Sequence, residues 1–333
     1  MNELRAEAEQ LLGDLPFESC DQYEAIQITS SQKDNANPTF EDKTFNEAGL
    51  RAFIDDSLLH PDTITLKLVR MHYHPRGGFK SSLSIFQHVW HSFGLDPYMI
   101  YMFHHNVPGF HQLSASPSSP LQQFYVNYKG HWLLWTYDPL NVSTNAILLS
   151  HRSPGGRASY PGFHARLKRY RTLVGHSLFL ALATTLNQIV YVDSFLREQS
   201  NRVNEMEKHT GFSHFHIHKP RPQMEDAGAE LARLSDLSRS AGSVLVGLAD
   251  MIEHLHCSST VVEAILNSSL IGDAQRVDIM TGSERDMKSI ASVLGPQLKE
   301  TFRHVEYIRE RAKNHLTVVW FPPIHWINQL NSS

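Results

Sequence analysis

The chain has 333 residues, of which 41% are hydrophobic and 19% charged, so it can bury a core and is not broadly disordered. Its 30 basic and 34 acidic residues give a formal net charge of -4, which argues against a dedicated nucleic-acid binder. Two cysteines exclude a disulfide scaffold and a four-cysteine zinc site, and they indicate a reducing compartment.

Residues 1–60 are predicted as a polar N-terminal segment with short helices. We expect one helix near 2–13, then loop, and a second short helix near 46–60. The acidic start of the chain lacks the apolar run of a secretory signal. A cytoplasmic location is therefore expected.

Residues 61–158 are predicted as a mixed α/β part. In 63–73, apolar residues alternate with Thr65 and Lys67, which indicates a strand. Helices are expected at 81–93 and 96–104. Further strands are expected at 109–115, 123–128, 131–137 and 146–150, and Lys129-Gly130 indicates a hairpin between the second and third of these. The Ser-Pro-Gly-Gly run at 153–156 is expected to end this part.

Residues 159–320 are predicted as a bundle of long helices, at about 163–208, 226–257 and 259–270, with a last helix that begins at an N-cap near Ser283. Pro296 should kink this last helix. Its apolar stripe comprises Met287, Ile290, Leu294, Leu298, Val305, Ile308, Ala312, Leu316 and Val319. We expect the end near Leu316 to project like a stalk and either to meet another protomer or to lie exposed. Residues 321–333 are expected to be an irregular tail. The fold class is thus α+β: a mixed α/β layer, then long helices ending in a stalk-like helix.

Residues 172–192 carry no charge and are long enough to cross a bilayer. Five polar side chains interrupt this run, and they are costly in lipid but inexpensive in a protein interior that offers partners: His176, Thr184, Thr185, Asn187 and Gln188. We therefore expect a buried core helix. A single membrane span is the alternative.

The sequence contains none of the patterns GxGxxG, GxxxxGK[ST], HExxH or GxSxG, and this shifts the expectation toward a protein that is not an enzyme. No catalytic or cofactor-binding residue is predicted, and metal ligands stay unknown. Three groups were considered as ligands: His214, His216 and His218; Asp250, Glu253, His254 and Cys257; and His72 with His74. Three alternate residues of a strand span about 13 Å, too far to meet at one ion. We interpret the first group as a surface loop, the second as a solvated helix face, and His72 as an edge or surface residue.

A basic run begins the helix expected at about 163: Arg166, Lys168, Arg169 and Arg171. Positive charge in the first turns of a helix opposes the helix dipole. A solvated face is the plain interpretation. The alternatives are a carboxylate cluster of another chain or a membrane surface.

Two phrases carry a resemblance to a known family. One is Val203-Asn-Glu-Met-Glu-Lys-His-Thr-Gly211, which follows the Leu-Phe-Leu-Ala-Leu-Ala core at 178–183, and the other is Tyr307–Val319. Together with the order of elements over roughly 60–319, they resemble the cytosolic part of fungal CorA-like proteins, relatives of CorA-type magnesium channels. In that family the last long helix leads into a membrane span that a Gly-Met-Asn signature closes. Five protomers surround the pore.

The sequence departs from that pattern. It contains no Gly-Met-Asn, and WFPPIHWINQLNSS follows Val319 in place of an apolar span. The resemblance therefore implies a cytosolic domain truncated before the membrane helices, with a regulatory or interaction role in divalent metal ion transport and no transport by itself. It implies self-association or assembly with full-length CorA-like protomers, indirect membrane contact, and a divalent cation such as magnesium. The alternative is a soluble metal-dependent enzyme whose site is built from scattered histidines.

Overall fold

A computed structural model describes residues 2–31, 37–56, 63–74, 78–113, 120–128, 131–151, 160–210, 227–268 and 277–320. The chain divides into two compact units, and each is described by itself. Unit 1 comprises 1–188 and 257–295, and unit 2 comprises 189–256 and 296–333. The boundaries expected near 60 and 158 do not coincide with this division.

Unit 1 is built on one mixed sheet, which within the described residues has nine strands in the order β1-β5-β4-β9-β8-β7-β6, with β2 and β3 attached beside β4. β4 and β9 run parallel at its centre, from Thr65 beside Ser143 to Tyr73 beside His151. On its other side β4 pairs first with β2, along residues 63–70, and then with β5, along residues 72–74. The strand bounds are β1 Phe17–Glu18, β2 Tyr23–Ser31, β3 Thr39–Phe45, β4 Thr63–His74, β5 Gly78–Lys80, β6 Gly109–Leu113, β7 Gln122–Tyr128, β8 His131–Asp138 and β9 Ser143–His151.

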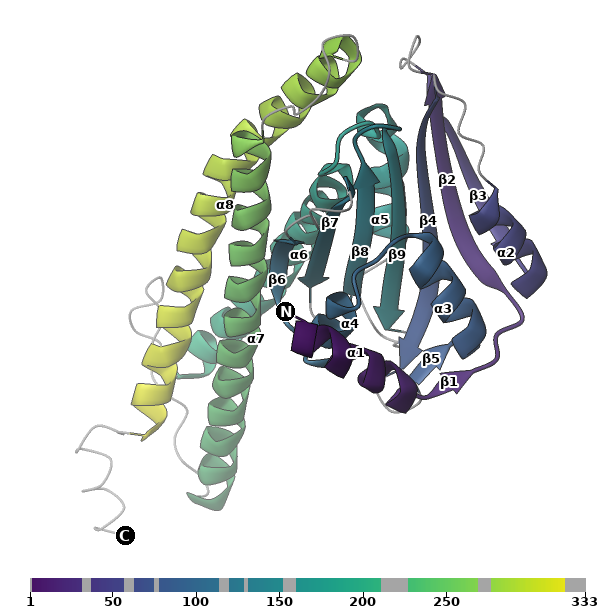
Figure 1. Cartoon of the computed structure of the whole chain (residues 1–333). Coiled ribbons are helices and arrows are strands. Elements are labelled where there is room, and N and C mark those ends of the chain that lie inside the picture. The colour runs from purple at the N-terminus through teal and green to yellow at the C-terminus, as the bar shows by residue number, and fades with distance from the viewer. Residues whose placement is uncertain are drawn as a thin grey trace. The chain divides into compact units, whose positions relative to one another are not determined.

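Helices cover both faces of this sheet. On one face lie α1 (Asn2–Asp14), α2 (Glu47–Asp55), α3 (Leu83–Ser92) and α4 (Tyr98–His104), which pack on a buried cluster that includes Val69, Met71 and Ile147 (Figure 1). On the other face lies α5 (Tyr160–Arg169), where the Arg70 guanidinium stacks on the Tyr160 ring at 3.8 Å. Alternate residues of a strand point to opposite faces, so each central strand supplies both cores.

The prediction of loop between the first two helices was wrong, because residues 23–31 and 39–45 form β2 and β3. β2 pairs with β4 over eight residues, and Ile26 and Ile28 are fully buried. β3 pairs only with β2 and is largely exposed, so its sequence is polar. The predicted strand at 63–73, the helices at 81–93 and 96–104 and the four later strands are confirmed within one to three residues.

The long helices begin and end at other residues than the sequence predicted. The helix predicted at 163–208 is two: α5 and α6 (Phe179–Thr210), with a 3-10 turn at Arg171–Leu173 between them. The two helices predicted at 226–257 and 259–270 are one, α7 (Ala227–Asn267), because neither glycine nor proline interrupts the chain near Ser258. The last helix, α8 (Val277–Trp320), begins before Ser283, so the predicted N-cap is wrong and Ser283 is a buried helix-interior residue.

Unit 2 is a packed group of three helix segments from α6, α7 and α8. Gly247 of α7 contacts the ring of Phe195 in α6, and His256 of α7 lies 4.9 Å from the ring of Phe302 in α8. Between α6 and α8, Arg311 donates two hydrogen bonds to Glu207, at 2.8 and 2.7 Å. Both side chains of this ion pair are nearly inaccessible, at 11% and 7% exposure.

The apolar stripe of α8 is covered within the chain. Val305, Ile308 and Ala312 are fully buried, and Leu316 is half-buried. The expectation that the end near Leu316 lies exposed was therefore wrong, whereas its expected contact with another protomer stays a prediction. Exposed apolar side chains of unit 2 lie elsewhere, at Val190, Val246 and Tyr307.

One helix within the described residues is long and apolar enough to cross a membrane, over Phe179–Lys208, and 56% of its most apolar window is buried. Two of the threonines that interrupt this run form hydrogen bonds, whereas the buried Gln188 Nε2 atom has no hydrogen-bond partner among the described residues. Thr184 donates to the Leu180 carbonyl at 2.8 Å, and Thr185 bonds the Tyr128 hydroxyl at 3.3 Å. The segment therefore packs as a core helix, which is what its polar side chains predicted.

Candidate functional site

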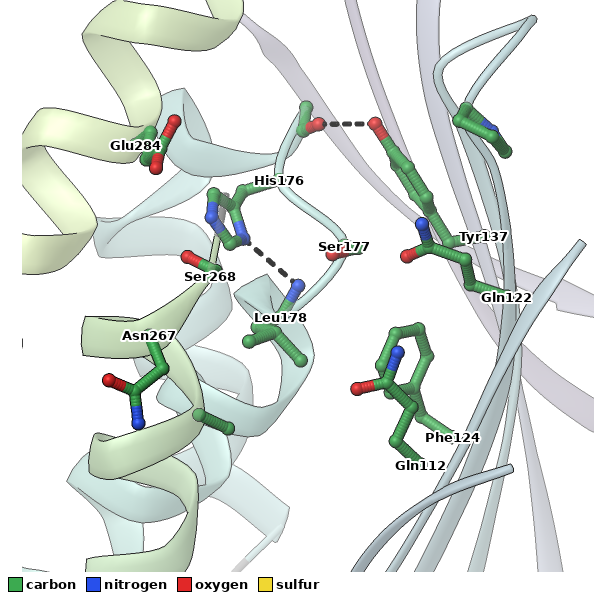
Figure 2. A pocket seen from close by; sticks show the side chains of 13 residues that line it. Gln112, Gln122, Phe124, Tyr137, His176, Ser177, Leu178, Asn267, Ser268 and Glu284 are labelled. Atoms are coloured by element: carbon green, nitrogen blue, oxygen red, sulfur yellow. Dashed lines mark hydrogen bonds between the residues drawn. The ribbon is translucent and has the colours of Figure 1, made fainter. Parts of the chain in front are cut away.

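A recess of about 330 Å3 opens in unit 1 beside the chain segment 175–178. We call it the His176 recess. Gln112, Gln122 and Phe124 project from β6 and β7 on one side, and Asn267, Ser268 and Glu284 lie on the other (Figure 2). Its lining is rich in amides and hydroxyls, so it presents both hydrogen-bond donors and acceptors.

The sheet itself interrupts the helix at this point. The Tyr137 hydroxyl donates to the Gly175 carbonyl at 3.0 Å (Figure 2), and the Trp135 indole N–H donates to the Ser177 carbonyl at 2.9 Å. A continuous helix would have used these carbonyls within its own backbone. Two aromatic side chains of β8 therefore replace helical hydrogen bonds and hold the segment open.

His176 caps the start of α6 with its side chain. Its Nδ1 atom accepts a hydrogen bond from the Leu178 backbone N–H at 3.0 Å, as Figure 2 shows. Burial lowers the pKa of His176 to about 4, and the Glu284 carboxylate opposes this shift only in part. The ring is therefore neutral at pH 7, and its proton is assigned to Nε2 because Nδ1 is an acceptor.

The recess offers hydrogen bonding in place of acid–base chemistry. His176 presents an Nε2–H donor, and its pKa lies too far below 7 for a general base. Glu284 is held by an ion pair with Lys288 at 2.6 Å. Glu284 and His176 are the two lining residues of the types that commonly bind metals, and nowhere in the described part of the chain do three His, Cys, Asp or Glu residues converge. A small polar ligand fits this lining best.

The candidate metal ligands are not brought together among the described residues. The run His214, His216 and His218 lies outside them. His72 is half-buried on a central strand, with Nδ1 3.4 Å from the Ser150 hydroxyl, so the edge-strand interpretation was wrong. His74, at the end of β4, is exposed.

The solvated-face interpretation of Asp250, Glu253, His254 and Cys257 was also wrong in part. Glu253 is exposed and Asp250 half-exposed, but His254 and Cys257 are buried. Burial raises the pKa of the Cys257 thiol to about 12, with a Tyr128 hydrogen bond opposing the shift. A thiol held in its neutral form is neither a nucleophile nor a metal ligand at pH 7.

The basic run lies at the opposite helix end from the one predicted. Arg166, Lys168 and Arg169 occupy the last turn of α5, where positive charge stabilises the helix dipole. Arg171 follows and donates to the Pro38 carbonyl at 2.9 Å. No compensating acidic partner is therefore required.

Sequence reasoning singled out His176 only as a polar interruption and missed Glu284 and the amides of the recess. Gln112 lies near the end of β6 and Gln122 begins β7, whereas Asn267 is the last residue of α7 and Ser268 follows it. In the sequence, the recess is marked locally by Gly175-His176-Ser177, which interrupts an apolar run. Only the folded sheet shows that these segments meet.

The fold defines a class of α+β proteins in which a mixed sheet precedes long helices. No protein-family profile matches the sequence, and no curated protein matches it. Among solved structures, the fold is similar to that of the full-length CmaX protein, with a TM-score of 0.53 and 12% sequence identity. The similarity covers 92% of this chain and 80% of the CmaX chain. At this identity the likeness concerns the fold alone.

Proposed function

We propose that this chain is a cytosolic domain of the fungal CorA-like class, with a regulatory or interaction role in divalent metal ion transport and no enzymatic activity. The observation that carries the proposal is the order of the fold. A mixed sheet is followed by long helices, the order that the resemblance to CorA-like proteins predicts, and the fold as a whole is similar to that of CmaX. The phrases at 203–211 and 307–319 support the same class.

The His176 recess supports a binding role. Burial lowers the pKa of His176 to about 4, so this ring is neutral at pH 7 and forms hydrogen bonds there, whereas general-base catalysis is most efficient with a group that changes protonation near pH 7. A ligand in the recess would touch β6, β7, the start of α6 and the end of α7 at once. Occupancy would thus stabilise one arrangement of these elements, which is what regulation by a small molecule requires.

The proposed partners are further copies of this chain or full-length CorA-like protomers. Exposed apolar side chains on unit 2 would make the contact, and Val246 in α7 is 66% exposed. The chain should co-purify with a full-length CorA-like protein in detergent and change its Mg²⁺ flux in liposomes. Val246→Lys should weaken both effects. Ser243→Lys is the control, since it adds the same charge at an exposed position of the same helix.

Lack of co-purification and of any flux change would contradict the proposal. The metal content of the purified chain distinguishes this proposal from its alternative, a soluble metal-dependent enzyme. A metal-dependent enzyme with a tight site should carry metal near stoichiometry, whereas a domain that senses or contacts a transporter should lose divalent ions readily to a chelator.

A further inference from the structure

A second cavity, of about 560 Å3, lies in unit 1 over the face of the sheet that carries α1–α4. Two rows of polar side chains cross four neighbouring strands beneath it. The register of the strands gives the first row as Gln27, Lys67, Asn145 and Thr136, and the second as Thr29, Thr65, Ser143 and Asp138. We call these eight residues the polar rows.

The polar rows adjoin an apolar row without a transition. The next residues on the same face are Ala25, Val69, Ile147 and Leu134, which pair in the same register and are at most 2% exposed. The polar rows are themselves well covered, since Thr65 and Ser143 are 8% exposed and Thr136 is 2% exposed. A strand end that simply faced water would be far more exposed. The polar residues therefore line a partly open cavity, with Thr65, Thr136 and Ser143 buried at its floor.

Some groups of the polar rows serve the protein. Thr136 donates to the Phe93 carbonyl at 2.7 Å, and the Lys67 ammonium donates to the carbonyls of Phe53 and Asp56 at 2.7 and 2.6 Å. These last bonds close the C-terminal end of α2. Lys67 is thereby committed to backbone oxygens and is not available to bind an anion.

Other groups stay available to a ligand. Within the described residues, the hydroxyls of Thr65 and Ser143 and the amide of Asn145 bond no protein group, and Thr65 lies directly beside Ser143 across the β4–β9 pair. Gln27 accepts from Lys43 through Oε1 at 2.6 Å, which leaves its amide N–H groups as donors. Neighbouring strands are about 4.8 Å apart, so these donors and acceptors form a two-dimensional array.

The charges around the cavity select the ligand. Asp55, Asp56 and Asp138 line it, so an anion is repelled. Asp55 is paired with His88 at 2.9 Å, and Asp138 accepts from the Leu140 N–H at 2.8 Å, so two of the three carboxylates are already satisfied and a cation gains little. Ile54, Phe93 and Leu121 also line the cavity and can contact the C–H groups of a ligand, whereas the polar rows can bond its hydroxyls. A neutral molecule with many hydroxyl groups remains.

We propose that the cavity over the polar rows binds a neutral polyhydroxylated small molecule of the size of a monosaccharide or cyclic polyol. The volume falls within the range of about 300–1,000 Å3 that is usual for small-molecule sites. Hydroxyls can both donate and accept, and they match an array of threonine, serine and amide groups.

The test uses the full chain with labelled threonine methyl groups and nuclear magnetic resonance titration. Glucose and myo-inositol are the neutral probes, with inorganic phosphate and spermidine as the charged ones. A neutral probe should shift the methyl signals of Thr65 and Thr136. It should leave Thr144 unchanged, because this residue is buried on the opposite face of β9.

Variants provide the second arm. Thr65→Val and Asn145→Leu should each weaken binding of the neutral probe by at least about tenfold, whereas Thr144→Val should leave it unchanged. If neither neutral probe shifts the Thr65 and Thr136 methyl signals of the parent, the proposal is wrong. It is equally overturned if only phosphate or spermidine shifts them.

Discussion

Replacing His176 with Asn should remove a specific pH dependence of folding. Asn can accept the Leu178 N–H through its side-chain oxygen, so the cap is kept while the titrating ring is lost. The pKa of His176 is about 4 in the folded chain, against an ordinary value of 6.5. The unfolded chain therefore binds the proton first as pH falls.

The sign and size of this pH dependence follow from the linkage between proton binding and folding. A lowered folded pKa contributes stability that is fully present above pH 6.5 and is lost as pH falls toward 4. The difference between 6.5 and 4, at 1.36 kcal/mol per pKa unit, corresponds to about 3 kcal/mol of unfolding free energy. Urea unfolding followed by tryptophan fluorescence, at pH steps between about 7 and 4, measures it.

The parent chain should lose about 3 kcal/mol more than His176→Asn over that interval. Two controls accompany the comparison. His104→Asn removes an exposed histidine, and Glu284→Gln removes the carboxylate that partly supports the protonated ring. Glu284→Gln should lower the pKa of His176 further and steepen the loss. Equal pH profiles for the parent and His176→Asn would refute the reasoning.

Three further changes have distinct expected outcomes. Arg311→Met removes the two short hydrogen bonds to the buried Glu207 carboxylate, which keeps its longer 3.7 Å contact with His315, and should cost about 3 kcal/mol in urea unfolding, with a smaller loss when Glu207→Gln is added. Gly78→Ala should cost about 2 kcal/mol or more, because φ is +80° and a Cβ would lie 2.0 Å from a backbone oxygen, whereas Gly242→Ala, with open space around it in α7, should gain about 0.5–1 kcal/mol. Both glycine variants are read by thermal unfolding, and a gain at Gly78 would contradict the geometry. Chelator should not change the melting temperature of the parent, nor should triple alanine replacement of His214, His216 and His218.

The strands with strong alternation could be predicted from the sequence, and those at the edge could not. β4 has large apolar residues at every second position, and its bounds came out within one residue. β2 has only Ile26 and Ile28 as large aliphatic residues, and β3 exposes most of its side chains as an edge strand. An edge strand needs few apolar residues, so its sequence resembles a loop.

The candidate site could not be predicted because its hydrogen bonds join distant segments. The helix break at His176 depends on Tyr137 and Trp135, about 40 residues earlier in the chain. The burial of His254 and Cys257 depends likewise on what packs against α7. A helix whose polar residues face a neighbouring helix cannot be distinguished by spacing from one whose polar residues face water.

The polar rows gave a misleading signal for the same reason. Thr65 and Lys67 alternate with apolar residues, which is typical of a strand with one solvated face. In the structure helices cover both faces of the sheet, and these two residues line a partly open cavity. An alternating pattern shows that the two faces of a strand have different environments. It does not show that either face is exposed to water.

The discontinuity of unit 1 has a consequence for biosynthesis. Residues 1–188 need 257–295 to complete the unit, and the residues between belong to unit 2. During translation, the sheet can pair β4 with β9 once residue 151 has left the ribosome, yet the wall of the His176 recess formed by Asn267 and Glu284 is still missing. A nascent chain must therefore carry an incomplete sheet unit through more than a hundred further residues, exposed to chaperones for that time. Fragments cut at the linear midpoint would inherit this defect permanently, because residues 257–295 would be absent from the N-terminal fragment.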